Sequence, residues 1–149
     1  MRKRGVTLVE LIVVMAIIAI GAAFVAPNIG AWVPNYRLRS ASRDVTSTLR
    51  MAQMKAISNN TLYHVSFNPG AGSFILQYQD TGGNWIDDGV AATLPKGVLI
   101  SGISFPGNNA QFSPNSTSST GSITLTNTKG STKTITLTTS TGKVTVDPK

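Results

Sequence analysis

The sequence predicts an α+β protein in which a long N-terminal helix precedes an antiparallel β-sheet domain. Three patterns support this prediction: an apolar stretch over residues 6–26, apolar positions at helical spacing after it, and short alternating runs after residue 60. The chain has 149 residues, 41% of them hydrophobic. It is therefore the size of one domain and is neither a fibrous repeat nor a fully disordered chain.

The residue content argues against most enzyme classes. The chain contains no cysteine, which rules out disulfides, cysteine-ligated metals and a cysteine nucleophile. Its one histidine, His64, cannot form a His–His metal pair and argues against a Ser-His-Asp site. No glycine-rich phosphate-binding motif is present. We therefore expect a non-enzymatic protein without a cofactor or metal, in which His64 is structural.

Positive charge is concentrated at the N-terminus. The formal net charge is +7, and the three basic residues at positions 2–4 supply part of it. Ten basic and six acidic residues follow Gly5, a net charge of +4. No acidic residue lies between Gly89 and Val146, although four lysines do. This distribution permits a polyanion such as DNA as a partner without requiring one.

The apolar stretch of residues 6–26 predicts a membrane-spanning helix. Glu10 is its one charged residue, and 21 residues in a helix reach about 31 Å. The basic residues before it should stay in the cytoplasm, which places the rest of the chain outside. The alternative is a cleavable signal peptide that releases a secreted β-rich binding domain, because Gly21 and Ala23 form a small-x-small pattern before Phe24. The carboxylate of Glu10 and the helical pattern beyond Pro27 argue against that alternative.

Residues 27–60 predict the amphipathic second half of the helix. Pro27 and Pro34 should kink or locally unwind the helix without breaking it, and the pair Asn59-Asn60 should end it. The apolar positions recur at steps of three and four residues: Leu38, Ala41, Val45, Leu49, Ala52 and Ala56.

Basic residues mark two places for contact with a polyanion. Arg39, Arg43 and Arg50 form a stripe on another face of the same helix. Such a stripe is usually a solvated face, and the alternative is contact with a partner or polyanion. Lys143, in the acid-free C-terminal half, is the fourth candidate.

The chain after residue 60 predicts six strands. The runs are 62–67, 74–79, 98–103, 122–126, 134–138 and 143–146. Turns at 68–72 and 128–131 should join the first two strands and the fourth and fifth strands as hairpins. In the last three strands, apolar residues alternate with Thr or Lys, so one face should be buried: Ile123, Leu125, Ile135, Leu137, Val144 and Val146.

A cluster of acidic and amide side chains lies in a glycine-rich loop. Asp80, Asn84, Asp87 and Asp88 could supply oxygen ligands to calcium, but their spacing does not match an EF-hand loop. We expect an ordinary acidic turn, with Trp85 packed on the sheet. Asp87 and Asp88 are adjacent and no third acid–base group is evident, which argues against a paired-carboxylate hydrolase.

Glu10 is the most informative single residue. A buried carboxylate must be paired or neutralised, and no basic residue lies near it within the helix. We therefore expect another chain to supply its partner. If the chain were cut after Gly5, the new α-amino group of Val6 on a neighbouring subunit would be a suitable cation.

Residues 5–11, Gly-Val-Thr-Leu-Val-Glu-Leu, resemble the class III signal of type IV pilins and type II secretion pseudopilins. The resemblance implies that residues 1–5 form a leader peptide and that a prepilin peptidase cuts between Gly5 and Val6. It also implies N-methylation of Val6 and a role for Glu10 in recruiting and registering each subunit in a filament.

The rest of the chain resembles the GspH/FimT branch of minor pilins. The motifs are 49–52, 55–59, Trp85, 96–98, 112–115, 121–125 and 141–144. The resemblance implies a type IV pilin-like fold with two β-sheets packed against the helix, residues 61–149 forming a periplasmic domain. It also implies a single pass through the bacterial inner membrane. The implied partners are other pilins or pseudopilins, prepilin peptidase, the inner-membrane assembly platform and membrane lipid.

Two machines use such subunits. We predict a minor pseudopilin that supports assembly of the type II secretion pseudopilus tip and export of folded proteins. The alternative is a minor type IV pilin that primes pilus assembly or takes part in DNA uptake. In DNA-binding members two arginines follow a glycine near the C-terminus, whereas Gly142-Lys143-Val144-Thr145 keeps one basic residue. This difference argues against direct DNA capture, while the acid-free C-terminal half keeps it open.

Overall fold

The computed structural model describes residues 7–139 and 143–148 and confirms the α+β class. The chain divides into two compact units, Met1–Val33 and Pro34–Lys149. One helix, α1 (Leu8–Ser58), begins in the first unit and ends in the second.

The first unit consists of the N-terminal part of α1. Thr7 caps the helix: its Oγ1 accepts a hydrogen bond from the backbone N–H of Glu10 at 3.3 Å. The apolar side chains that follow are exposed, from 74% at Leu8 to 47% at Val14. Within the part of the chain that the structure describes, no helical segment combines the length and hydropathy of a membrane span.

The helix continues through Pro27 and Pro34 without a break, as predicted. We expect a kink at Pro27 because a proline cannot donate the backbone hydrogen bond of a helix interior. This kink stays a prediction. At its other end, α1 stops at Ser58, and Asn60 adopts a left-handed backbone with φ of 51°. The prediction that Asn59-Asn60 ends the helix is confirmed.

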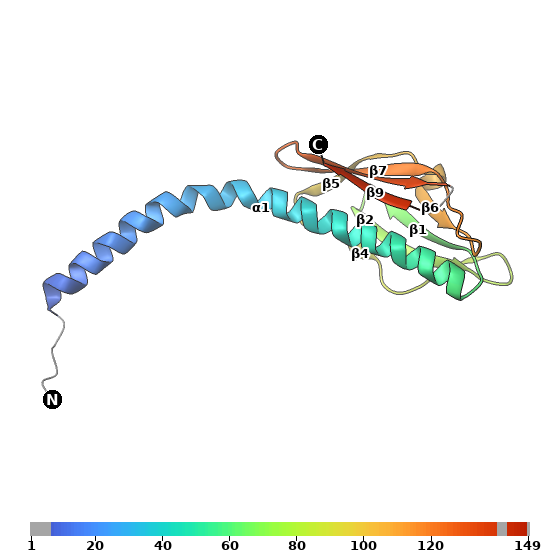
Figure 1. Ribbon diagram of the computed structural model, residues 1–149, viewed down its shortest axis with the longest axis horizontal. Helices are drawn as coiled ribbons and strands as arrows, with labels where there is room; N and C mark the ends of the chain where they lie inside the picture. Colours follow the sequence, from blue (N-terminus) through green and yellow to red (C-terminus); the bar gives the residue numbers. More distant parts are fainter. Residues whose placement is uncertain (1–6, 140–142, 149) are drawn as a thin grey trace, which may run out of the picture. The chain divides into compact units, whose positions relative to one another are not determined.

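The second unit packs the C-terminal half of α1 against two antiparallel sheets, as expected (Figure 1). The five-stranded sheet has the order β3-β2-β1-β6, and β4 also pairs with β2. Its strands are β1 (Tyr63–Asn68), β2 (Ser73–Gln79), β3 (Trp85–Asp87), β4 (Ala92–Thr93) and β6 (Asn109–Phe112).

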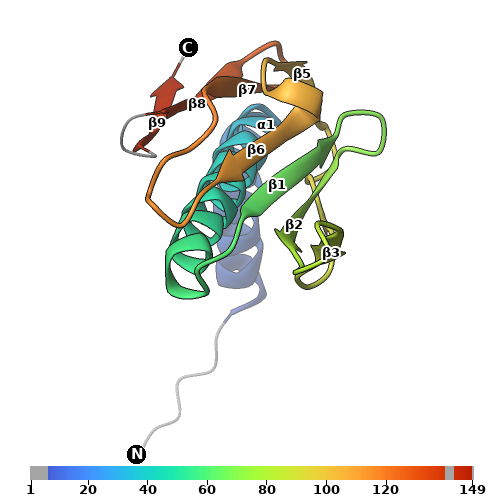
Figure 2. The same ribbon diagram turned by 90° about the vertical axis from the view of Figure 1, so that its right-hand side faces the viewer.

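The four-stranded sheet has the order β5-β7-β8-β9. It contains β5 (Val98–Ile103), β7 (Gly121–Asn127), β8 (Thr132–Thr138) and β9 (Lys143–Pro148). A short 3₁₀ turn, η1 (Pro106–Asn108), precedes β6. Viewed along α1, the strands lie around one side of the helix, and β9 forms an outer edge (Figure 2).

One hydrophobic core joins the helix to both sheets. All six predicted apolar positions of α1 are buried in it, and so are Ile123, Leu125, Ile135 and Leu137. The prediction is wrong for Val146, whose side chain is 36% exposed, and Val144 is only partly buried. Both lie on β9, which is the edge strand of its sheet among the strands of the described chain.

The two predicted hairpins, β1–β2 and β7–β8, are present in antiparallel register. Three strands were missed: β3, β4 and β6. The first two are only three and two residues long, too short for an alternating pattern to be recognised. Ala110 and Phe112 of β6 do alternate with polar residues, and both are fully buried.

Candidate functional site

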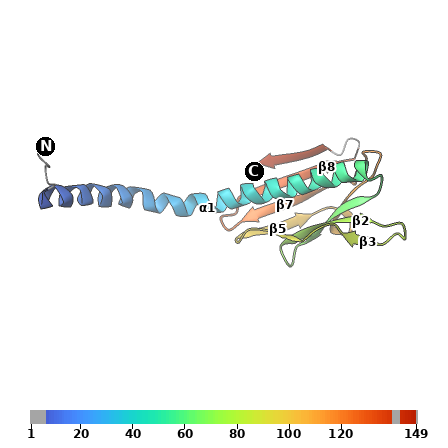
Figure 3. The same ribbon diagram turned by 90° about the horizontal axis from the view of Figure 1, so that it is seen from below.

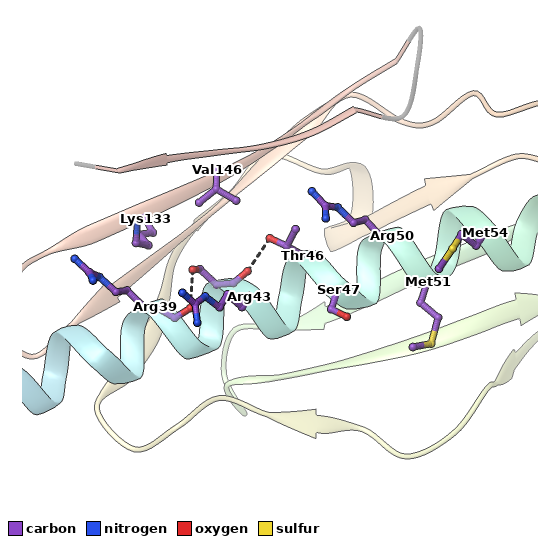
Figure 4. Close-up of a pocket in the computed structure, with 10 residues that line it drawn as sticks. Arg39, Arg43, Thr46, Ser47, Arg50, Met51, Met54, Lys133 and Val146 are labelled. Carbon is purple, nitrogen blue, oxygen red and sulfur yellow. Dashed lines mark hydrogen bonds between the residues drawn. The ribbon is translucent and has the colours of Figure 1, made fainter.

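The three predicted arginines lie together along a groove beside α1. Arg39, Arg43 and Arg50 project from one side of the helix, and Lys133 of β8 and Val146 of β9 face them (Figure 4). Their spacing of four and seven residues keeps the arginines on one helix face. The groove has a volume of about 730 Å³. We call this surface the basic groove.

At the base of the basic groove, the hydroxyl groups of Ser42 and Thr46 already donate hydrogen bonds to the helix backbone. Ser42 donates its hydroxyl proton to the carbonyl oxygen of Arg39 at 3.0 Å, and Thr46 donates to that of Ser42 at 2.7 Å (Figure 4). Both side chains are nearly buried, at 4% and 9% exposure. The groups available to a ligand are therefore mainly the cationic side chains on the walls.

The groove also has an apolar part that sequence analysis missed. Met51 and Met54 line it and are 43% and 63% exposed. Helical spacing from Arg43 and Arg50 could have placed both methionines beside the arginine stripe. Lys133 could not be found this way, because the pairing of distant strands brings it to the helix.

Lys143, the fourth predicted basic residue, lies at the start of β9 and is exposed. It is not among the residues that line the basic groove. The structure therefore brings three of the four predicted residues together. The fourth cation of the groove is Lys133 and not Lys143.

Glu10 lies in the first turn of α1 and is exposed. Thr7 and Glu10 have the spacing of a capping box, a motif that sequence analysis missed, in which the residue at the third helical position is Glu or Gln. A carboxylate in the first turn also complements the positive end of the helix dipole. Within the described residues, the carboxylate of Glu10 forms no ion pair.

The acidic loop is a hydrogen-bonded turn. Asp80 Oδ1 accepts hydrogen bonds from the backbone N–H groups of Gly82 and Asn84, each at 2.8 Å. These bonds, the one from Asn84 above all, lower the pKa of the Asp80 carboxyl. The other two acids point to different partners: Asp87 accepts from Gln77 at 2.7 Å, and Asp88 pairs with Lys55 at 2.7 Å.

His64 has a structural environment, as expected. It is 4% exposed, and its ring stacks on Trp85 with the ring centroids 3.7 Å apart. Burial lowers the pKa of His64, and the hydrogen bond to Gln77 opposes this effect. The stacking also confirms that Trp85 packs on the sheet.

Two predicted sites lie outside the described residues. These are the cleavage and methylation site at Gly5 and Val6, and the Thr141-Gly142 part of the C-terminal motif.

Two family models match the sequence. Residues 1–26 match the prokaryotic N-terminal methylation motif. Residues 41–147 match the family described as Type II transport protein GspH. The chain belongs to the GspH family. It is therefore a minor pseudopilin of the type II secretion system, as the sequence motifs predicted.

Solved GspH-like structures share the fold. A structure of the minor pseudopilin EpsH from the type 2 secretion system of Vibrio cholerae aligns with a TM-score of 0.66 at 9% identity, covering 75% of this chain and 97% of that chain. A crystal structure described as the same minor pseudopilin aligns with a TM-score of 0.65 at 11% identity, covering 78% and 97%. At such low identity the likeness concerns the fold. No curated protein matches the sequence closely enough to count as a relative.

Proposed function

We propose that this GspH-family chain is a structural, non-catalytic subunit that residues 6–26 anchor in the bacterial inner membrane. The methylation motif over residues 1–26 supports this proposal. The apolar side chains exposed on all sides of the first part of α1 support it too, because such a helix requires lipid or other protein around it. The chain crosses the membrane once, and the basic residues 2–4 keep its N-terminus in the cytoplasm. The β-sheet domain is then periplasmic.

Assembly begins with processing of the N-terminus. A prepilin peptidase cuts between Gly5 and Val6, and Val6 is then N-methylated. Cleavage removes the three basic residues of the leader and creates an α-amino group at the membrane surface. The processed subunit passes to the inner-membrane assembly platform and enters a pseudopilus with other pseudopilins. Its place at or near the tip supports the export of folded proteins.

Glu10 supplies the negative charge that sets the position of this subunit relative to its neighbour in the filament. Its carboxylate pairs with the α-amino group of Val6 on a neighbouring subunit, where low polarity strengthens the attraction. The observation that carries this proposal is a carboxylate exposed among apolar side chains in the first turn of α1. The local alternative is that Glu10 only caps the helix, as the spacing from Thr7 suggests.

Two substitutions separate these roles. Glu10→Gln keeps a side chain that suits a capping box but removes the negative charge, whereas Thr7→Ala removes the cap and keeps the charge. We expect Glu10→Gln to reach the membrane fraction but to be lost from sheared pseudopili, and Thr7→Ala to be incorporated. Normal incorporation of Glu10→Gln would disprove the charge pair. Loss of incorporation for both variants would assign the effect to the start of the helix.

The anchoring proposal has a separate test. Mass spectrometry of the chain from membranes should find a mature N-terminus at a methylated Val6. An N-terminus at Phe24 would instead identify an ordinary signal peptide and a secreted domain.

A further inference from the structure

The basic groove has a strongly one-sided charge. Four of its lining residues are cations, Arg39, Arg43, Arg50 and Lys133, and none is acidic. The nearest acids in the sequence lie elsewhere: Asp147 follows Val146 in β9, so its side chain points to the opposite face of the sheet, and Asp44 is turned about 100° around the helix from Arg43. Within residues 7–139 and 143–148, none of the four cations forms an ion pair.

One wall of the groove is the free edge of a sheet. Strand β9 pairs with β8 on one side and is the last strand of its sheet in the described chain. Such an edge carries unpaired backbone N–H and C=O groups that can receive another strand. The close-up shows the strands that carry Lys133 and Val146 running alongside the arginine-bearing turns of α1 (Figure 4), and the view from below shows β8 beside the second half of α1 (Figure 3).

The two walls have matching lengths. From Arg39 to Arg50 the helix rises about 17 Å, at about 1.5 Å per residue. The six residues of β9 span about 17 Å in an extended strand. Val146 is the residue of β9 that lines the groove, and a peptide of about six residues paired with β9 would be long enough to pass all three arginines. Because strand side chains alternate, every second residue of that peptide would face the helix.

We propose that the basic groove binds an acidic, extended segment of a partner protein, which adds to β9 as a further strand and turns its carboxylates toward the arginines of α1. Guanidinium groups pair with carboxylates through two parallel hydrogen bonds, which gives the site its preference. Met51, Met54 and Val146 provide adaptable apolar contact for the remaining side chains. The site lies outside the first turn of α1, so it can be tested independently of the Glu10 proposal.

The binding test uses the full-length chain in detergent and a fluorescent six-residue peptide that alternates glutamate and threonine. Arg43→Gln combined with Arg50→Gln should weaken binding at least about tenfold, since each substitution removes a charge-assisted contact. The matched control, Lys96→Gln combined with Lys129→Gln, removes the same net charge outside the groove and should change affinity less than about twofold. Equal effects of the two double variants would overturn the proposal, because they would indicate attraction by net charge alone.

Strand addition has its own control. Two further peptides carry N-methyl groups on the odd or on the even residues, which removes alternate backbone donors and leaves the charge unchanged. One of the two should bind at least about tenfold more weakly than the parent peptide, because an added strand uses the N–H groups of alternate residues. Equal binding by all three peptides would overturn strand addition.

Cross-linking locates the peptide. Since the chain has no cysteine, Val146→Cys creates a single thiol in the groove and Lys129→Cys a single thiol outside it. A peptide with a terminal cysteine should form a disulfide with the first variant and not with the second. Cross-linking at both sites alike would contradict the proposed location. Duplex DNA that displaces the peptide at equal charge concentration, with the same dependence on Arg43 and Arg50, would replace this proposal with a polyanion surface.

Discussion

The Nε2 atom of His64 lies 2.6 Å from the Oε1 atom of Gln77. The Nε2 atom of Gln77 donates in turn to Asp87 at 2.7 Å, and a carboxylate can only accept. The amide oxygen of Gln77 must therefore face His64, so Nε2 of His64 carries the proton. The three residues sit opposite one another on β1, β2 and β3, and the row extends across the sheet.

The burial of His64 predicts that stability falls in acid, and that replacing His64 reduces this loss. Burial lowers the pKa of His64, so the unfolded chain takes up a proton before the folded chain does. Stability should therefore fall as pH decreases below the ordinary histidine value of about 6.5, until the folded chain is also protonated. Urea unfolding between about pH 7.5 and 5 should show this loss for the native chain and a smaller one for His64→Gln. Parallel pH profiles for the two chains would contradict the assignment.

Gly121 has no room for a side chain. A Cβ atom at this position would collide with Cδ1 of Phe105 and lie 2.8 Å from its Cε1, and Phe105 is 4% exposed. Gly121→Ala should therefore lower the free energy of unfolding by about 1–3 kcal/mol, because the buried ring has to move. Gly102→Ala is the control in the same sheet, since its Cβ would meet Thr124 at an ordinary 3.9 Å. Similar denaturation midpoints for the two variants would show that Phe105 shifts at little cost.

Hydrogen bonds of the Asn127 side chain connect the β7–β8 turn to helix α1. Its Oδ1 accepts from the backbone N–H groups of Lys129 and Ser131, each at 2.9 Å, and its Nδ2 donates to Asn35 at 2.8 Å. Asn127 is 5% exposed, so Asn127→Ala should cost about 1–3 kcal/mol by leaving buried groups without partners. Asn127→Asp keeps both acceptor bonds and should be less destabilised than the alanine variant in the same unfolding assay. The reverse order would mean that the bond to Asn35 dominates.

The ion pair of Lys55 and Asp88 should contribute little to the free energy of unfolding. Its atoms are 2.7 Å apart, but the side chains are 38% and 25% exposed. A double-mutant cycle with Lys55→Met and Asp88→Asn should give a coupling free energy of about 0.2–1 kcal/mol, reduced at about 1 M salt. The hydrogen bond to Asp88 raises the pKa of Lys55, so the pair stabilises the fold at neutral pH and its contribution is lost as pH rises above the ordinary lysine value. A coupling unaffected by salt would show that the pair is more shielded than its exposure indicates.

Periodicity predicted the parts of the fold that depend on local spacing. The buried face of α1, the end of the helix at Asn59-Asn60 and the β7–β8 hairpin all follow from residues within a few turns or one loop of each other. The leader motif is likewise contained in a few consecutive residues. Such features are readable because 3.6-residue and 2-residue repeats decide which side chains share a face.

The sequence by itself thus determined the helix, most of the strands and the membership of a pseudopilin family. Only the tertiary structure decided that Lys133 and Val146 face the arginines of α1, that Val146 lies on a free edge, and that Gln77 stands between His64 and Asp87. These relationships join residues that are ten to about a hundred positions apart. They depend on which strands pair and which sheet face meets the helix, and local spacing carries no information about either.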